Sequence, residues 1–311
     1  MKYVNVVLSL VAAGMLIVAC EKKDDEAEVQ EFLDRCWFVG GELQSADDST
    51  STPQSISGCP GLAADTFPFY VKWVRFIERP VDRHYDIDVV GDSAFVTMTA
   101  YFEGTPPGYG FFYANDSPVG SGPVRVRAIS DSVIRKIKCY RDDAGWHLAS
   151  LTVADIYTVG TDHPVTITKI EARVGGNLVF TVDNPNTYFT KEQLPTFKPS
   201  DTVEVTVYCE AQGDSTWAFL HHGAGHRPGI GLKRHWRQPF YRENTTTFKR
   251  TWIIADDSVV VTPAVRHSAV DVLGWETLFG DSTATYYSCA WGIPYIIKDQ
   301  NDTLPDDSEP E

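Results

Sequence analysis

From residue 165 onward the sequence alternates between apolar and polar residues, with no sustained helical periodicity. Seven segments have the two-residue period and the β-branched and aromatic content that are typical of strands. They are VTITKIEARV, NLVFTV, TVEVTVYCEA, TWAFLHH, TTFKRTWIIA, AVDVLGWETL and WGIPYIIK. The links between them are short and contain Gly, Pro, Asn and Asp, which favour turns. Because such strands bury their apolar faces by packing sheet against sheet, we expect a β-sandwich over residues 159–298.

Several residues of this second part resemble the core of immunoglobulin-like domains. Cys209 lies on the apolar face of its strand, and Tyr287 precedes Cys289 by two residues, as in the tyrosine corner of antibody domains. Trp217 follows Cys209 by eight residues, a shorter spacing than antibody domains have. The resemblance implies an immunoglobulin-like sandwich. Cys209 and Cys289 would then form either a disulfide or two buried thiols.

The first part of the chain, residues 32–158, combines a helical signal with an antiparallel meander. The segment DTFPFYVKWVRFIERPV places Phe69, Trp73, Phe76 and Ile77 on one helical face, so it predicts a helix that ends at a proline. Strands are expected in HYDIDVV, AFVTMTAYF, VRVRAI, VIRKIKCY and WHLASLTV. Helices followed by antiparallel strands predict an α+β domain.

Two stretches of this part resemble the nuclear transport factor 2-like superfamily, which includes ketosteroid isomerase. They are DRHYDIDVVGDSAFVTMTAYFEG and VIRKIKCYRDDAGWHLASLTV. The resemblance implies a cone-shaped fold with an apolar pocket, in which an enzyme would need an acid or base. His84, Asp86 and Asp88 are the nearest candidates. They share the strand face opposite the apolar one, so we expect them to face water.

The N-terminal residues predict export and lipidation. Lys2 and the apolar run Val6–Val18 match a signal peptide, since the run is shorter than the ~20 residues that a membrane span needs. The ending Ile17-Val18-Ala19-Cys20 resembles the lipobox of bacterial lipoproteins. The resemblance implies that residues 1–19 are removed and that Cys20 carries the lipid anchor. An ordinary signal peptide or a short buried helix is the alternative.

Acidic residues follow the anchor and return at the end of the chain. Residues 20–31 hold six acids against two lysines, which predicts a solvated tether. Lys23-Asp24-Asp25-Glu26 also resembles an export tag for the outer face of Gram-negative cells. A tether facing the periplasm is the alternative. The segment 299–311 holds six acids and no base, and we expect it to be a disordered tail.

The overall charge of −15 comes mainly from these two ends, so the remainder is only mildly acidic. Nucleic-acid binding is therefore disfavoured. Export permits disulfides, and Cys36, Cys59, Cys139, Cys209 and Cys289 remain once Cys20 is lipidated. Their odd number leaves at least one unpaired within the chain. A Cys36–Cys59 bridge is the candidate within the first part.

Two clusters in the second part have residue types that can bind ligands. His221, His222 and His226 lie close enough in the sequence to reach one metal ion, although adjacent strand residues point to opposite faces. The stretch 227–250 is locally basic and aromatic, and its candidate partner-binding residues are Arg234, Trp236, Arg237 and Tyr241. Solvated histidines and a solvated strand face are the alternatives, and no cofactor is expected.

No nucleotide-binding or hydrolase motif accompanies these clusters in the sequence. The sequence therefore favours a non-catalytic lipoprotein of the bacterial cell envelope, facing the periplasm or displayed on the surface. It would bind or space an envelope glycan, lipid or protein. The alternative is a small-molecule binder or enzyme that uses a pocket in the cone fold.

Overall fold

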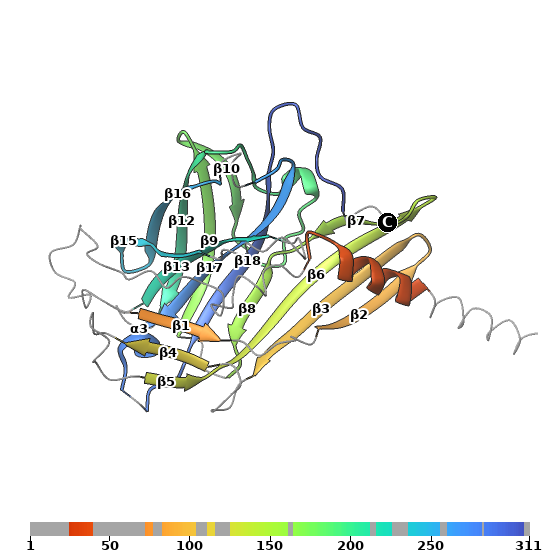
Figure 1. Ribbon diagram of the computed structural model, residues 1–311. Coiled ribbons are helices and arrows are strands. Elements are labelled where there is room, and N and C mark those ends of the chain that lie inside the picture. Colours follow the sequence, from red (N-terminus) through yellow and green to blue (C-terminus); the bar gives the residue numbers. More distant parts are fainter. Residues whose placement is uncertain are drawn as a thin grey trace, which may run out of the picture.

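A computed structural model describes the protein in ten segments (Figure 1). They are residues 25–39, 72–76, 83–103, 111–115, 125–160, 164–211, 216–225, 236–255, 260–281 and 283–307. Antiparallel strands make up most of these segments. The helical elements described are residues 25–35, α3 (Trp275–Phe279) and the 3-10 turn η2 (Lys191–Gln193).

The largest sheet has ten strands and runs through both halves of the chain. Its strand order is β14-β13-β17-β18-β8-β6-β3-β2, with β7 paired to β6 and β11 paired in parallel to β18. The bounds are β2 Arg83–Val90, β3 Ser93–Glu103, β6 Ser130–Asp142, β7 Gly145–Leu151, β8 Ala154–Thr158, β11 Thr196–Phe197, β13 Thr216–Gly225, β14 Trp236–Pro239, β17 Ala264–Gly274 and β18 Ser288–Ile297. Because β8 pairs with both β6 and β18, this sheet continues across the expected domain boundary at 158/159.

A five-stranded sheet packs on one face of the second half of the large sheet. Its order is β10-β9-β12-β16-β15. The bounds are β9 Val165–Val174, β10 Asn177–Val182, β12 Thr202–Ala211, β15 Tyr241–Asn244 and β16 Thr247–Ile253. Across the interface, the Trp252 ring lies 4.9 Å from that of Tyr295 and 5.2 Å from that of His222.

A three-stranded sheet lies on the opposite face, formed by β1 (Lys72–Phe76), β4 (Phe111–Asn115) and β5 (Arg125–Ala128). Trp73 of β1 packs edge-on against Phe219 of β13, with ring centroids 4.9 Å apart. Arg127 of β5 donates hydrogen bonds to the backbone carbonyls of Glu276 and Gly280 and thereby caps the C-terminal end of α3.

The helix over residues 25–35 lies beside β2, β3 and β6 (Figure 1). Its buried Val29 and Leu33 belong to the apolar core, and Tyr85 of β2 donates a hydrogen bond to Asp34 over 3.1 Å. The opposite face of these strands carries exposed Phe95 and Tyr101.

The predicted fold class, an α+β cone followed by an immunoglobulin-like sandwich, is wrong. The described chain is mostly antiparallel sheet with two short helices, so no helical layer forms a cone, and only a sandwich-like packing of sheets is present. Within the segment predicted as a helix around Trp73, the described residues Lys72–Phe76 form strand β1, while Phe69 and Ile77 lie outside the described residues. Trp73 and Arg75 are both buried and two residues apart, a spacing that puts them on one strand face.

The described residues bear on four further expectations. The segment AVDVLGWETL is a strand only up to Gly274, after which α3 begins. The acidic tether is helical from Asp25, and the C-terminal segment is ordered as far as Asp307. His84, Asp86 and Asp88 are exposed on β2, as predicted.

The C-terminal segment is held by Asp307, which is 7% exposed. Its carboxylate accepts a hydrogen bond from the backbone N–H of Leu148 over 3.0 Å and lies 2.8 Å from the Lys191 ammonium. Its backbone carbonyl accepts a hydrogen bond from the Trp37 N–H. Local acidity predicted a solvated tail, but the carboxylate and the backbone carbonyl of Asp307 together have three partners in the folded body.

Candidate functional site

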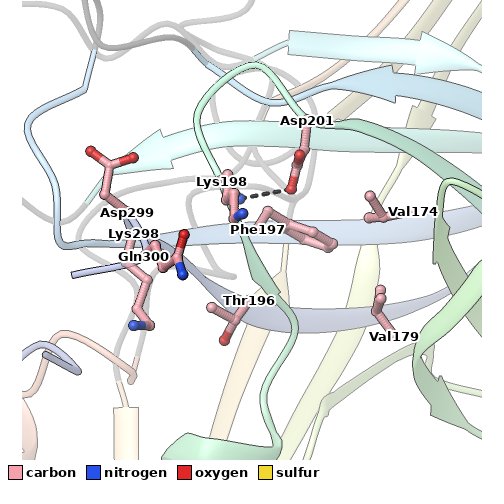
Figure 2. A pocket seen from close by; sticks show the side chains of 9 residues that line it. All are labelled: Val174, Val179, Thr196, Phe197, Lys198, Asp201, Lys298, Asp299 and Gln300. Carbon is pink, nitrogen blue, oxygen red and sulfur yellow. Dashed lines mark hydrogen bonds between the residues drawn. The ribbon is translucent and has the colours of Figure 1, made fainter. Parts of the chain in front are cut away.

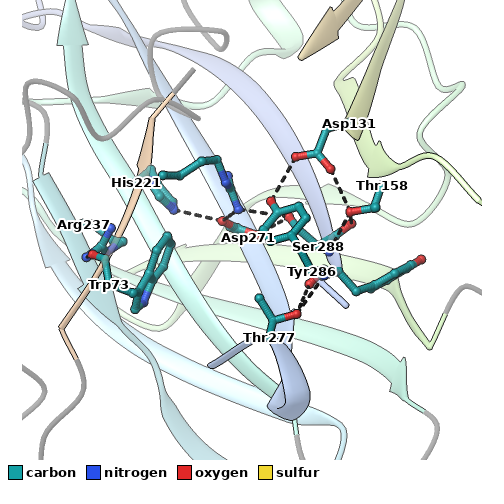
Figure 3. A network of polar contacts seen from close by, with 11 residues as sticks. Trp73, Asp131, Thr158, His221, Arg237, Asp271, Thr277, Tyr286 and Ser288 are labelled. Atoms are coloured by element: carbon teal, nitrogen blue, oxygen red, sulfur yellow. Dashed lines mark hydrogen bonds and ion pairs between the residues drawn. The ribbon is translucent and has the colours of Figure 1, made fainter. Parts of the chain in front are cut away.

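A cluster of ionisable and polar side chains is buried between the large sheet and β1 (Figure 3). Arg75 of β1 donates a hydrogen bond to the Asp271 carboxylate of β17 over 2.7 Å and another to the Ser288 hydroxyl over 3.1 Å. Ser288 in turn donates to the second Asp271 oxygen over 2.9 Å. His221 Nε2 of β13 lies 3.3 Å from Asp271 Oδ2. These four side chains come from β1, β13, β17 and β18, so the cluster ties four strands together.

A second carboxylate extends the cluster toward β6 and β8. Asp131 accepts hydrogen bonds from the Thr158 hydroxyl over 2.7 Å and from the Tyr286 hydroxyl over 2.9 Å. The Thr158 hydroxyl also accepts the Ser288 N–H over 3.0 Å. Thr158 therefore connects Asp131 to the strand that carries Ser288.

The two carboxylates have opposite pKa shifts, because Asp271 forms a direct ion pair with Arg75 whereas Asp131 accepts hydrogen bonds from two hydroxyl groups. Burial raises the pKa of Asp131 to about 6, against the lowering effects of Arg75 and of its two hydroxyl donors. Burial also acts to raise the pKa of Asp271, but the charge of Arg75, with His221 and Ser288, lowers it to about 2. Burial raises the pKa of Tyr286 as well.

Trp73 closes the cluster on the side of β14. The guanidinium of Arg237 lies 3.5 Å from the Trp73 ring centroid and also donates to the Trp73 backbone carbonyl. Arg75 lies 5.7 Å from the same ring centroid. Each cation is attracted to the π-face of the indole, a contact that strengthens when water is excluded.

The arrangement differs from that of a hydrolase with an activated serine. Ser288 donates to Asp271 and not to His221, so the base that would activate it is missing from its hydrogen bonds. Asp271 and His221 are 0% exposed, as is Ser288. The cluster therefore connects the sheets and stabilises their packing. A substrate could reach it only if the sheets separated.

An open groove of about 250 Å³ lies at another end of the sandwich (Figure 2). It is lined by Val174, Val179, Thr196, Phe197, Lys198, Asp201, Lys298, Asp299 and Gln300. Asp201 accepts a hydrogen bond from the Lys198 N–H, and Lys298 donates to the Asp302 carbonyl over 2.7 Å. These polar groups hold the two chain turns around an apolar floor.

The histidines predicted as weak metal ligands are separated by the sheet. His221 faces Asp271 and Trp73, whereas His222 packs on Trp252 on the opposite face. Burial, reinforced by the charge of Arg250, lowers the pKa of His222 to about 3. His226 lies outside the described residues. Within the segments described, no three His, Cys, Asp or Glu side chains form a group that could hold a metal.

Two cations of the basic, aromatic stretch, Arg237 and Arg250, make contacts within the fold. Arg237 is 2% exposed, and Arg250 donates to Gln238 over 2.7 Å. Tyr241 is 48% exposed. Arg234 lies outside the described residues, as does the side chain of Trp236. The structure therefore places Arg237 and Tyr241 apart, one in the interior and one on the surface.

Four of the cysteines are described, and all are buried free thiols: Cys36, Cys139, Cys209 and Cys289. Burial raises the pKa of Cys209 to about 11 and that of Cys289 to about 12, so both thiols are in their unreactive protonated form near neutral pH. Cys36 is one of these free thiols, so the predicted bridge from Cys36 is not formed, and Cys59 itself lies outside the described residues.

The helix after the expected anchor is fixed to the sheet at its first described residue, Asp25. The Asp25 carboxylate lies 2.6 Å from the Arg141 guanidinium of β6, which also stands over the Trp146 ring. Cys20 lies outside the described residues. Among the parts described, no helix is both long and apolar enough to cross a bilayer.

The buried cluster was missed by the sequence reasoning, although a signal for it exists. Asp271 lies between Val270 and Val272 in a strongly apolar strand, and Arg75 is flanked by Val74 and Phe76. A charged residue in such a strand needs a partner, because an unpaired buried charge is very costly. Two oppositely charged residues in this setting are candidates for pairing with each other.

Comparison of the sequence with protein-family models gives no match, and comparison with curated proteins gives no significant relative.

Proposed function

We propose that this protein is a non-catalytic lipoprotein of the bacterial cell envelope, anchored in a membrane through Cys20. Its sheets would form a rigid body that binds or spaces an envelope glycan, lipid or protein. The observation that carries the proposal is the lipobox-like ending Ile17-Val18-Ala19-Cys20. The helix described from Asp25, five residues after Cys20, is held on the body by Arg141. A lipid on Cys20 would therefore be joined to the folded body by a short connection.

The use of the interior acids and bases supports a non-catalytic role. Asp131 and Asp271 are hydrogen-bonded to side chains of neighbouring strands and are shielded from water. Their interactions stabilise the assembly of the sheets. Partner binding would then use exposed side chains, and Tyr241 is the described member of the predicted set that is exposed.

The proposal is tested by expressing the full chain in a Gram-negative host with labelled palmitate. Wild type should incorporate the label and sediment with membranes, whereas Cys20→Ala should do neither, because the acylated thiol is absent. Cys59→Ala keeps Cys20 and serves as the matched control, so it should behave as wild type. Labelling of Cys20→Ala at the wild-type level would contradict the proposed anchor.

A further inference from the structure

We infer that the end of the large sheet carrying the β2–β3 and β6–β7 turns faces the membrane, with the strands extending away from the bilayer. This orientation rests on the proposed lipidation of Cys20 and adds to it a surface that lies against lipid headgroups. The surface consists of Gly91 and Asp92 in one turn and of Asp142, Asp143 and Ala144 in the other.

The first step is that the helix cannot swing freely from the body. Asp25 is paired with Arg141, and Arg141 donates its backbone N–H to the carbonyl of Asp92, so all three lie at the turns. Val29 and Leu33 are completely buried farther along the helix. The N-terminal end of the helix is therefore fixed beside both turns (Figure 1).

The second step is the reach of the chain. Five peptide units join Cys20 to Asp25 and span at most about 18 Å even when fully extended. Strand β6 has 13 residues, from Ser130 to Asp142, and extends over about 40 Å. An acyl chain on Cys20 therefore keeps the Asp142 end near the bilayer, while the Ser130 end is about 40 Å farther along the strand.

The third step is the chemistry of the uncovered sheet face, which would contact lipid if the molecule lay flat. Phe95 is 46% exposed, but its cross-strand neighbour is Lys138, and Thr97 stands opposite Lys136. The adjacent strand adds exposed Asp86 and Asp88. Charges at this spacing interrupt the apolar area that burial in a bilayer requires.

The charge of the two turns indicates which interaction holds this end of the sheet at the membrane. Asp92, Asp142 and Asp143 are exposed, and Arg141 is already engaged by Asp25. Such an end is not attracted to anionic headgroups, so the acyl chains supply the binding and the short connection supplies the orientation. Membrane association should accordingly be insensitive to salt, unlike binding through exposed basic residues.

The test uses energy transfer from the full-length lipidated protein to the bilayer surface. A fluorophore is attached at Asp143→Cys or at Ser130→Cys, both exposed positions, in a Cys59→Ala background. The protein is reconstituted in phosphatidylethanolamine–phosphatidylglycerol vesicles that contain a headgroup-labelled acceptor lipid. We expect severalfold more transfer from position 143 than from position 130, at low and high salt alike.

The control inserts 15 Gly and Ser residues between Lys23 and Asp24, which should strongly reduce the difference because the fully extended connection, about 70 Å, is then longer than β6 and no longer fixes the orientation. Equal transfer without the insertion, or greater transfer from position 130, would overturn the orientation. Failure of the protein to acquire lipid would instead overturn the proposed anchor, so the two failures are distinguishable. Matching unfolding curves verify that the labelled variants are folded.

Discussion

Arg75 and Asp271 are 196 positions apart in the chain, yet their charged groups lie 2.7 Å apart and both side chains are buried. The pair joins the three-stranded sheet to the middle of the large sheet. Two charges taken out of water gain little net stability over well-packed apolar residues, but a single charge left behind is costly. The pair therefore favours this placement of β1 on the large sheet over others, which would leave a buried charge without its partner.

Removing one partner of this pair should destabilise the fold strongly. We expect Arg75→Ala to lower the free energy of unfolding by about 3–5 kcal/mol, because Asp271 is left buried without its cation. Urea unfolding followed by tryptophan fluorescence measures the effect. The double variant Arg75→Met/Asp271→Leu serves as the comparison and should be more stable than Arg75→Ala. Similar stability of the two variants would show that the loss of stability does not come from the unpaired Asp271 carboxylate.

Asp131 should make stability depend on pH between about 4 and 7. Its folded-state pKa is raised to about 6, so its contribution to stability is present below its unfolded-state pKa and is lost as the pH rises through 6. The loss is on the order of 2–3 kcal/mol. Asp131→Asn cannot ionise, so its unfolding free energy should lack this fall.

Asp271 provides the opposite pH dependence in the same molecule. Its folded-state pKa is lowered to about 2, so its contribution is present above its unfolded-state pKa and is lost as the pH falls through 2. The Asp131→Asn variant should therefore still lose stability below pH 4, because that loss comes from Asp271. A variant whose stability still falls between pH 4 and 7 as in wild type would rule out Asp131 as the titrating group.

Local patterns predicted many strands well because each strand buries alternate residues. HYDIDVV is β2 and alternates as expected, and VTITKIEARV is β9 with the predicted bounds. What failed was the choice between helix and strand for the segment around Trp73. Large apolar residues three and four positions apart indicated a helix, but the buried pair Trp73 and Arg75 follows the period of a strand.

The arrangement of strands could not be read from local patterns. The link between the two halves depends on β8 pairing with β18, whose residues are more than 130 positions apart. The same holds for the tail, where Asp307 is fixed by Leu148 and Lys191. Long-range partners of this kind decide the fold class, and a single sequence shows only that the buried charges need them.

Asp307 should be required for docking of the C-terminal segment. We expect Asp307→Ala to cost about 1–3 kcal/mol, since the Leu148 N–H loses its acceptor and Lys191 loses its counter-ion. Asp306 is exposed, so Asp306→Ala removes the same charge from the same segment without these contacts. Thermal unfolding and limited proteolysis near the C-terminus compare the two. Equal behaviour of both variants would mean that the segment is not held by this carboxylate.

The basic, aromatic stretch gives a prediction that separates folding from partner binding. Arg237 is buried against Trp73, so Arg237→Ala should lower the free energy of unfolding by about 2–4 kcal/mol through the lost cation–π contact and hydrogen bond. Tyr241 is largely exposed, so Tyr241→Ala should change stability by less than about 0.5 kcal/mol.

If this stretch contacts an anionic envelope partner, Tyr241→Ala and Arg234→Ala should both reduce sedimentation with isolated envelope fractions. That binding should also weaken as salt rises, because exposed charges are screened. Anchor-free Cys20→Ala protein is used throughout, so that acylation does not contribute. Wild-type stability of Arg237→Ala would refute its placement in the interior, and unchanged sedimentation of Tyr241→Ala and Arg234→Ala would exclude this stretch as the binding surface.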